Sequence, residues 1–247
     1  MAAYRIGCAG WSLPGPVHNA FPSHGSHLQR YASRFNATEI NSSFHRPHLP
    51  ATYARWAATV PDEFRFAVKI PKAITHEQYL VASDVLLDVF LSEATCLGGR
   101  MGCLLVQLPP KLAYDAPTAE SFFSDLRERH AGPIALEPRH ASWFTGEVET
   151  RLRAHRVSRV AADPAPVPPA GAPGGWPEIV YIRLHGSPRM YYSAYDEPYL
   201  DGLADRLRDA GAGAQEVWCI FDNTALGAAT PNALGLLERR RRRALGA

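Results

Sequence analysis

Short apolar runs, each followed by polar or charged residues, recur along the chain at intervals of roughly 20–40 residues. Within each run the apolar residues are continuous rather than alternating, which is typical of strands buried on both faces of a parallel sheet. Eight runs have this pattern: Tyr4–Gly10, Ala37–Ser43, Arg65–Pro71, Gly102–Pro109, Gly132–Arg139, Ser158–Pro164, Val180–Gly186 and Glu216–Asn223.

Most of the segments between these runs have helical spacing of apolar residues. Strands that alternate with helices indicate an α/β fold, and eight such units in about 250 residues are typical of a barrel. We therefore predict a single (β/α)8 TIM-type barrel domain over residues 1–247. The expected helices are Gly25–Phe35, Pro50–Val60, Val81–Gly99, Pro117–Gly132, Ser142–Arg156 and Glu197–Gly211.

The segment after the sixth strand departs from this rhythm. Asp163–Pro177 is rich in proline and glycine, which excludes a helix. We interpret it as an irregular connection within the barrel. An interdomain linker would leave six strands on one side and two on the other, and neither part would close alone.

Charged and polar residues lie at the ends of the predicted strands, where the active sites of such barrels are found. Residues two apart on a strand share a side. This pairs Glu39 with Asn41, Glu137 with Arg139 and Arg183 with His185, and sends these side chains into the barrel mouth. Lys69 and Gln107 end two further strands.

Buried charges must compensate one another, because removing an unpaired ion from water costs roughly several kcal/mol of folding free energy. We expect Glu39 to pair with Lys69 on the neighbouring strand, and Glu137 to meet Arg183 across the interior. Two acids against three cations then leave one positive charge in surplus. Such a mouth would attract a carboxylate, a phosphate or a sugar phosphate.

Other interpretations of the same residues stay open. The charges can form a purely structural ionic network, and Glu39, Glu137, His185 and Asp222 are residue types that bind divalent metals. We assign no metal site, because Lys69 and Arg183 would repel a cation. A nucleophilic role for Cys8 would need a basic partner such as histidine, and the sequence shows no Cys–His pairing.

Aromatic residues follow several strands, and such rims stack sugars or bases. They are Trp11, His45, Trp143, Tyr191, Tyr192 and Tyr195. Arg189 lies in the same loop as the three tyrosines, after the seventh strand, where barrels often bind phosphate. Packing of a lid is the alternative role for these rings.

Bulk composition narrows the partners only slightly. The net charge is +2 with neutral histidines and the pI is about 8.4, which permits anionic ligands without requiring them. Four cysteines without metal-site spacing, and no long apolar stretch, predict a cytoplasmic protein without a membrane segment. Five consecutive arginines, Arg239 to Arg243, are typical of a nucleic-acid patch or of a solvated last helix.

Several ordered motifs resemble the domain-of-unknown-function-72 family, also called YecE-like. They are GCAGWS near the start, TEINSSFHRP (Thr38–Pro47), FRFAVKIPKAITHE (Phe64–Glu77), LLVQLPP (Leu104–Pro110), ALEPRHASWF (Ala135–Phe144), RLHG (Arg183–Gly186) and IFDNTALGAATPNAL (Ile220–Leu234). The resemblance implies a TIM-type barrel. In general shape the family is similar to metal-dependent DNA-repair endonucleases and sugar isomerases.

The family motifs fall on most of the strand-end residues above and add His140, Gly186 and Asn223. Two departures from the family pattern stand out. His45 replaces a tyrosine, and LPGPVHNAFPSHG replaces a tryptophan-and-tyrosine pattern in the first loop.

The leading hypothesis is a hydrolase or lyase acting on a phosphate-bearing or polyhydroxylated small molecule. The candidate catalytic residues are Glu39, Glu137 and His185. The candidate substrate-binding residues are Trp11, Asn41, Lys69, Gln107, Arg139, His140, Arg183, Arg189, Tyr191, Tyr192 and Asn223. The alternative is a non-catalytic protein that binds nucleic acid or an anionic ligand. The sequence leaves any cofactor and the oligomeric state open.

Overall fold

The computed structural model describes residues 2–245, and its strands form two sheets. Neighbouring strands are parallel in both sheets, except for β8, which is antiparallel to β6. The larger sheet has the order β2 (Ala37–Ile40), β3 (Arg65–Lys69), β4 (Met101–Gln107), β5 (Ile134–Glu137), β6 (Val157–Arg159) and β8 (Gly174–Gly175). The smaller has the order β1 (Ala3–Cys8), β10 (Glu216–Phe221), β9 (Ile179–Leu184) and β7 (Ala161–Asp163).

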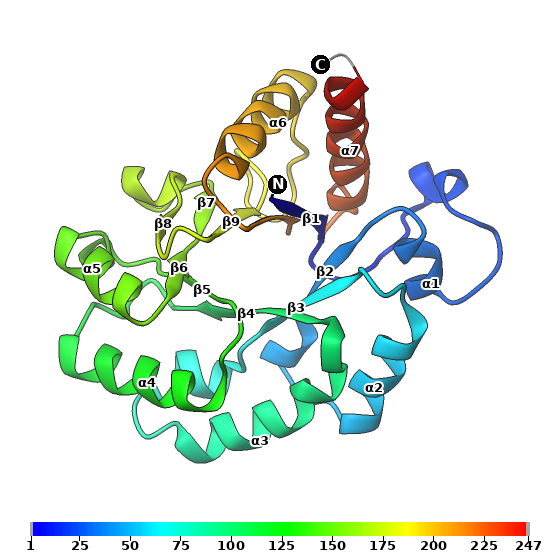
Figure 1. The fold of residues 1–247 in the computed structure, drawn as a ribbon. Helices are drawn as coiled ribbons and strands as arrows, with labels where there is room; N and C mark the ends of the chain where they lie inside the picture. Colours follow the sequence, from blue (N-terminus) through cyan, green and yellow to red (C-terminus); the bar gives the residue numbers. More distant parts are fainter. Residues whose placement is uncertain (1, 246–247) are drawn as a thin grey trace.

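Helices lie around the outside of the strands (Figure 1). The six predicted helices are present, although two of them are divided: α3 continues into the 3-10 helix η4, and η5 precedes α5. The α-helices are α1 (His27–Ala32), α2 (Pro50–Thr59), α3 (Asp84–Ala94), α4 (Ala116–Arg129), α5 (Gly146–Ala154), α6 (Glu197–Gly211) and α7 (Ala229–Leu245). The shorter helical turns are η1 (Gly15–Ala20), η2 (Ser42–Phe44), η3 (Ala73–Glu77), η4 (Thr95–Arg100), η5 (Ala141–Trp143) and η6 (Pro168–Gly171).

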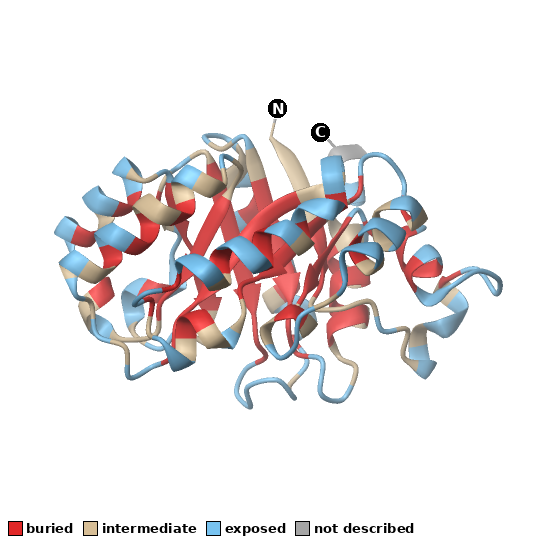
Figure 2. Ribbon diagram, turned by 90° about the horizontal axis from the view of Figure 1, so that it is seen from below, coloured by how far each residue is buried: buried red, intermediate tan, exposed pale blue. Residues whose placement is uncertain are grey.

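The predicted alternation of side chains along the strands is confirmed by two separate apolar clusters. An inner cluster contains Ala67, Ala135 and Tyr181, which share strand faces with Lys69, Glu137 and Arg183. The large outer cluster contains Val68 and Leu184, which face the helices. Figure 2 shows the result: the strands are buried, whereas the outer faces of the helices and many of the loops are exposed.

The edge between β1 and β2 is joined by a side chain instead of a regular backbone ladder. The hydroxyl of Tyr31 accepts a hydrogen bond from the Cys8 amide (2.7 Å) and donates one to the Ala37 carbonyl (3.0 Å). A Cβ atom on Gly7 would lie 1.9 Å from that carbonyl oxygen, so only glycine allows this approach. A single parallel bridge, between Ala9 and Glu39, follows toward the strand ends.

The other edge is a break within one continuous segment. β6 pairs with β5, and β7, one residue further along, pairs with β9. The amide of Val160, between the two strands, donates to the Leu136 carbonyl at 2.9 Å. The chain therefore crosses from one sheet to the other at this point.

These observations confirm a mixed α/β fold with mainly parallel strands. The described strands form two sheets, and a single (β/α)8 barrel stays a prediction. The segment after β7 contains no α-helix, as predicted. It holds instead the 3-10 turn η6 and the two-residue strand β8. Proline and glycine permit these short turns because they need no continuous helical hydrogen bonding.

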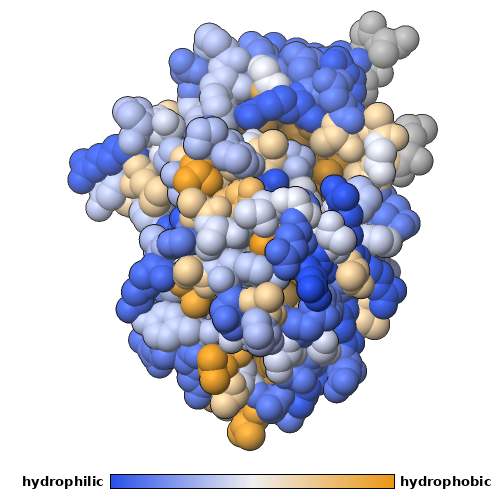
Figure 3. Space-filling view, turned by 90° about the vertical axis from the view of Figure 1, so that its left-hand side faces the viewer, coloured by the Kyte–Doolittle hydropathy of each residue, from blue (hydrophilic) through white to orange (hydrophobic). Residues whose placement is uncertain are grey.

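The face of the molecule in Figure 3 is mainly hydrophilic, with apolar side chains scattered over it. Among residues 2–245, no helix has the length and apolar character required to cross a bilayer. All four cysteines are free, and three of them are buried. The cytoplasmic location stays a prediction.

Candidate functional site at the carboxyl ends of the strands

Arg183, at the end of β9, is the centre of a buried ionic cluster. Its guanidinium contacts Glu39 through two nitrogens (2.7 and 3.0 Å), Glu137 at 2.9 Å and Asp222 at 2.9 Å. None of the Arg183 side chain is exposed. A planar fork with five N–H donors can serve several carboxylates at once, which an ammonium group cannot do with the same geometry. The predicted meeting of Glu137 and Arg183 is confirmed.

Glu39 is held on the inner side of this cluster. Its second partner is the hydroxyl of Tyr181, which donates to Oε2 at 2.9 Å, and its side chain is fully buried. The predicted pair of Glu39 with Lys69 is wrong, since Arg183 takes both carboxylate oxygens. The bidentate geometry of arginine explains this preference.

His185 lies between two carboxylates. Its Nε2 is 3.0 Å from Glu137 Oε1, and its Nδ1 is 3.0 Å from Asp222 Oδ2. A carboxylate only accepts hydrogen bonds, so both contacts form together only when both ring nitrogens carry a proton. Burial lowers the pKa of His185, but Glu137 and the hydrogen bond to Asp222 outweigh it, and the net pKa is raised.

Glu137 and Asp222 are held as carboxylates. Burial alone would raise the pKa of Glu137, but His185, Arg183 and Arg139 hold it well below its usual range. The pKa of Asp222 is lowered by Arg183 and His185 against the same effect of burial. Asp222 therefore belongs to the cluster as a third acid, which the predicted balance of two acids against three cations left out. With three acids facing Arg183, Arg139, Lys69 and His185, any surplus of positive charge depends on the protonation of His185 and Lys69.

Lys69, at the end of β3, has no ion pair among the described residues. Its Nζ lies 4.0 Å from the centroid of the Phe44 ring. Burial and Arg183 lower the pKa of Lys69 to about 8, although Glu39, Glu137 and Asp222 partly offset this. Lys69 therefore loses its proton more easily than Arg139 and Arg183 do.

A cavity of about 130 Å³ opens beside the cluster at the ends of β5, β7 and β9. Its polar lining consists of Glu137, Arg139 and His185. The remaining lining residues are apolar: Pro110, Ala162, Pro164, Pro166 and Met190. Arg139 donates to Glu137 Oε1 through two nitrogens, at 3.0 and 3.1 Å, and keeps 14% of its side chain exposed.

Three other predicted binding residues lie around this centre, and two more lie on the exposed loop after β9. Gln107 Oε1 accepts from Arg183 at 3.4 Å, and Asn41 Nδ2 lies 3.5 Å from Asp222 Oδ1. The ring of Tyr191 lies edge-on to His185, with centroids 5.7 Å apart. Arg189 stacks over the Tyr192 ring at 3.9 Å, and both residues are exposed on the loop after β9.

Three predicted rim residues have local structural contacts instead. Trp11 packs edge-on against Trp56, with centroids 5.1 Å apart. His140 caps η5 by accepting from the Ser142 amide. Trp143 is 1% exposed, and its Nε1 donates to the Leu112 carbonyl, so it belongs to the core.

Tyr195 and Asn223 also fasten the loop after β9. The Tyr195 hydroxyl accepts from the Gly186 amide (2.8 Å) and lies 2.8 Å from Asp163 Oδ1. The amide of Asn223 donates to Asn232 Oδ1 and to the Ser193 carbonyl. Asn232 was not predicted, because no spacing in the sequence relates it to strand ends.

Neither a metal site nor a reactive thiol gains support. Among the described residues no group of three or more histidine, cysteine, aspartate or glutamate side chains is arranged to bind a metal ion. Burial raises the pKa of Cys8 to about 12, which leaves it as an unreactive thiol.

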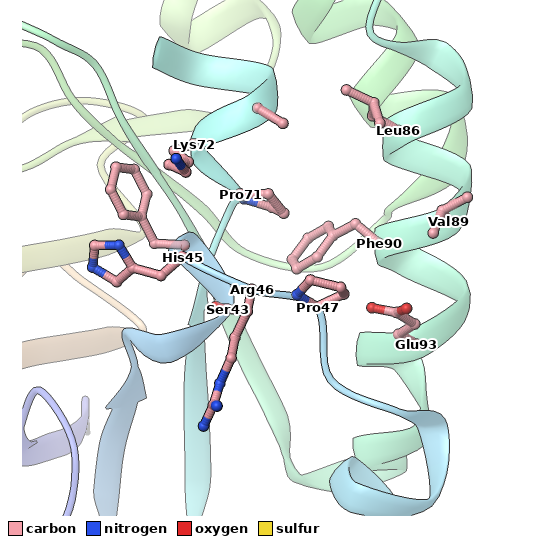
Figure 4. Close-up of a pocket in the computed structure, with 12 residues that line it drawn as sticks. Ser43, His45, Arg46, Pro47, Pro71, Lys72, Leu86, Val89, Phe90 and Glu93 are labelled. Carbon is pink, nitrogen blue, oxygen red and sulfur yellow. The ribbon is translucent and has the colours of Figure 1, made fainter. Parts of the chain in front are cut away.

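A second pocket, of about 200 Å³, lies between η2, η3 and α3 and is shown in Figure 4. Its walls include Pro47, Pro71 and Phe90, and Glu93 and Arg46 lie at its edge. It shares none of its lining with the cavity at Glu137 and His185. Phe44, which contacts Lys69, is one of its walls.

Comparisons with known proteins agree with this geometry at the level of the fold. A crystal structure of a DUF72 family protein from Enterococcus faecalis V583 superposes with a TM-score of 0.80 at 21% identity, covering 96% of this chain and 95% of that one. A second, from Thermotoga maritima MSB8, gives 0.79 at 23% identity, covering 99% and 100%.

Sequence relatives point to the same group. The UPF0759 protein YecE of Escherichia coli K12 is 33% identical over 168 residues, and the match spans 66% of this chain and 60% of that protein. The UPF0759 protein YunF of Bacillus subtilis 168 is 22% identical over 265 residues, covering 94% and 93%. The family model described as "Protein of unknown function DUF72" matches residues 5–246, and the chain therefore belongs to the DUF72 family.

Proposed function

We propose that this protein is an enzyme of the hydrolase or lyase type that acts on a phosphate-bearing or polyhydroxylated small molecule. In this proposal the two sheets work as one (β/α)8 barrel domain, with the reaction at the carboxyl ends of its strands. The observation that carries the proposal is the cavity in which Glu137, Arg139 and His185 meet. Ligand sites are concave and mostly apolar, with a few convergent polar groups, as this cavity is.

Proton transfer is the chemistry for which this pair is suited. Glu137 is held as a carboxylate and His185 as an imidazolium, 3.0 Å apart. Neighbouring groups whose pKa values are displaced in opposite directions are typical of acid and base partners. His185 would donate a proton to a leaving oxygen, and Glu137 would accept one.

Arg139 is the proposed anion-binding residue, because it is the partly exposed guanidinium of the cavity. Nε and Nη2 of Arg139 each donate to Glu137, so the remaining N–H groups, on Nη1 and Nη2, are the ones that would donate to a phosphate or carboxylate oxygen pair. Glu39 and Arg183 are fully buried, so we assign them the role of positioning Glu137 and Asp222 rather than contacting substrate.

The test is calorimetric titration of inorganic phosphate against the protein and its Arg139→Gln variant. We expect the variant to bind phosphate at least about tenfold more weakly, which corresponds to about 1.4 kcal/mol. Arg151→Gln, on the exposed face of α5, is the matched control and should bind as the parent does. Equal affinities in all three proteins would contradict the proposal.

A screen of sugar phosphates tests the catalytic half of the proposal. Any substrate found should be turned over at least about a hundredfold more slowly by Glu137→Gln, since positioned acid–base groups contribute about 10²–10⁴-fold. Undiminished turnover would remove Glu137 from the reaction.

A further inference from the structure

Lysine is rare in this chain and is confined to one region. The 26 basic residues comprise 23 arginines and three lysines, Lys69, Lys72 and Lys111. Lys69 ends β3, and Lys72 begins the turn that follows it. Arginine supplies nearly all the other positive charge of the chain. A lysine at the carboxyl end of β3 therefore points to a property that arginine lacks, which is an amine that can lose its proton.

The position of Lys69 suits a reactive amine. Its side chain is on the same face of β3 as Ala67, which belongs to the inner cluster. The residue is 6% exposed, and its nitrogen has no hydrogen bond or ion pair in the described part of the chain. Although the amine has no hydrogen-bond partner, it is not completely enclosed by protein, so it still reaches solvent.

The other two lysines differ in these respects. Lys72 is exposed and forms an ion pair with Glu77 at 3.0 Å. Lys111 is exposed, with its ammonium 4.9 Å from the centroid of the Tyr79 ring.

The charges around Lys69 keep its amine partly neutral. Burial and Arg183, on β9, lower its pKa to about 8 from 10.5, against the opposing effect of Glu39 on β2, Glu137 on β5 and Asp222 after β10. On the η3 side, burial and the charges of Lys69 and Arg139 lower the pKa of His76 to about 4, so His76 adds no charge near neutral pH. A desolvated lysine near other cations is a nucleophile that forms imines with carbonyl compounds.

We infer that Lys69 forms a covalent imine with the carbonyl carbon of an aldehyde or ketone substrate that also carries a phosphate or carboxylate. This inference rests on the proposed function and narrows it to a lyase acting on a carbonyl compound. Arg139 holds the anionic group, and Lys69 reacts with the carbonyl.

The step is balanced without any redox partner. The lone pair of the neutral amine forms the C–N bond, and the carbonyl oxygen leaves as water. One hydrogen of that water comes from the amine and the other from an acid, for which protonated His185 is the candidate. The product is an iminium ion, which draws electrons from the adjacent carbon and so favours bond cleavage or proton removal there. Water later reverses the step and releases the amine.

The experiment is reductive trapping of the full chain with glyceraldehyde 3-phosphate and cyanoborohydride, followed by peptide mass mapping. Because the chain has three lysines, the map is simple. We expect saturable labelling of Lys69 that is at least about tenfold faster at pH 8 than labelling of Lys72 or Lys111, since one unit of pKa is a factor of ten in neutral amine. The Lys69 rate should rise through pH 8. Lys69→Arg should abolish the saturable label, and Lys72→Arg should leave it unchanged.

Inorganic phosphate and Arg139→Gln separate this inference from the proposed function. Trapping at Lys69 that phosphate does not slow, and that Arg139→Gln does not alter, upholds the imine and contradicts the anion site. Phosphate binding that depends on Arg139, with no preference for Lys69 in the trapping, overturns the imine and leaves the anion site standing. Equal, unsaturable labelling of all three lysines also overturns the inference.

Discussion

At the scale of single residues, His185 is a group whose protonation changes the charge of the mouth. Its pKa is raised in the folded protein, so folding favours the imidazolium. The resulting stabilisation is complete below the ordinary histidine pKa of about 6.5 and is lost as the pH rises through the raised value. Glu137 and Asp222, whose pKa values are lowered, act in the opposite sense at acidic pH.

His185→Gln should therefore destabilise the protein most at about pH 6, below the ordinary histidine pKa. The difference in unfolding free energy between parent and variant should shrink as the pH rises beyond the raised pKa of His185. Urea denaturation at several pH values measures this difference. A gap that stays constant between acidic and alkaline pH would show that the imidazolium charge contributes nothing to folding.

At the scale of elements, the loop after β9 is fastened to α7 by one side chain. Asn232 Oδ1 accepts from the Tyr195 amide (3.0 Å) and from Asn223 Nδ2 (2.9 Å), and its Nδ2 donates to the Tyr195 carbonyl (2.8 Å). These groups are buried and have few alternative partners. The loop that carries Tyr191 toward His185 is therefore held in place by the first turns of α7.

Asn232→Ala should cost about 3 kcal/mol, because it leaves several buried polar groups unpaired. Denaturant unfolding measures the loss. Asn19→Ala, at an exposed position in η1, should stay within about 0.5 kcal/mol of the parent. Similar stability of the two variants would mean that the loop does not depend on Asn232.

The arginine run of α7, Arg239 to Arg243, lies beside acidic residues of α6. Arg239 forms ion pairs with Glu197 and Asp201, and Arg243 pairs with Asp205, all on α6. These contacts agree with the interpretation as a last helix that packs beside its neighbour. Acids of α6 compensate Arg239 and Arg243, two of the five arginines, and the hypothesis of a nucleic-acid patch stays untested.

The sequence predicts elements better than it predicts which partners they choose. The sequence predicts α2 and α6 nearly to the residue, because prolines mark both ends of α2 and because α6 has one apolar face. The ion pairs are harder to predict than the helices. Strand order favours a pair of Glu39 with Lys69 on the neighbouring strand, but the long guanidinium side chain of Arg183 contacts Glu39 instead. Tyr195 and Trp143 look like rim aromatics in sequence, and only their buried hydrogen bonds assign them to the core.

At the scale of the whole molecule, the two sheets depend on how β1 meets β2. Hydrogen bonds from side chains replace the ladder there: the Asn36 side chain accepts from the Ile6 amide (3.1 Å) and donates to the Tyr4 carbonyl (2.7 Å). The Tyr31 hydroxyl makes the next contact between the two strands, with the Cys8 amide and the Ala37 carbonyl. The mouth lies at the end of the same seam, since Glu39 forms the final bridge with Ala9. Loosening the seam should therefore reach the ionic cluster through Glu39.

Tyr31→Phe tests this dependence. Removing the hydroxyl leaves the Cys8 amide and the Ala37 carbonyl without their partner, so we expect a loss of about 1–3 kcal/mol in unfolding free energy. Tyr53→Phe is the matched control, because Tyr53 is equally buried but its hydroxyl has no hydrogen-bond partner. Removing that hydroxyl should be neutral or stabilising, since an unpaired buried polar group is lost. If both variants unfold at the same denaturant concentration, the phenol does not join the sheets, and contacts elsewhere hold β1 against β2.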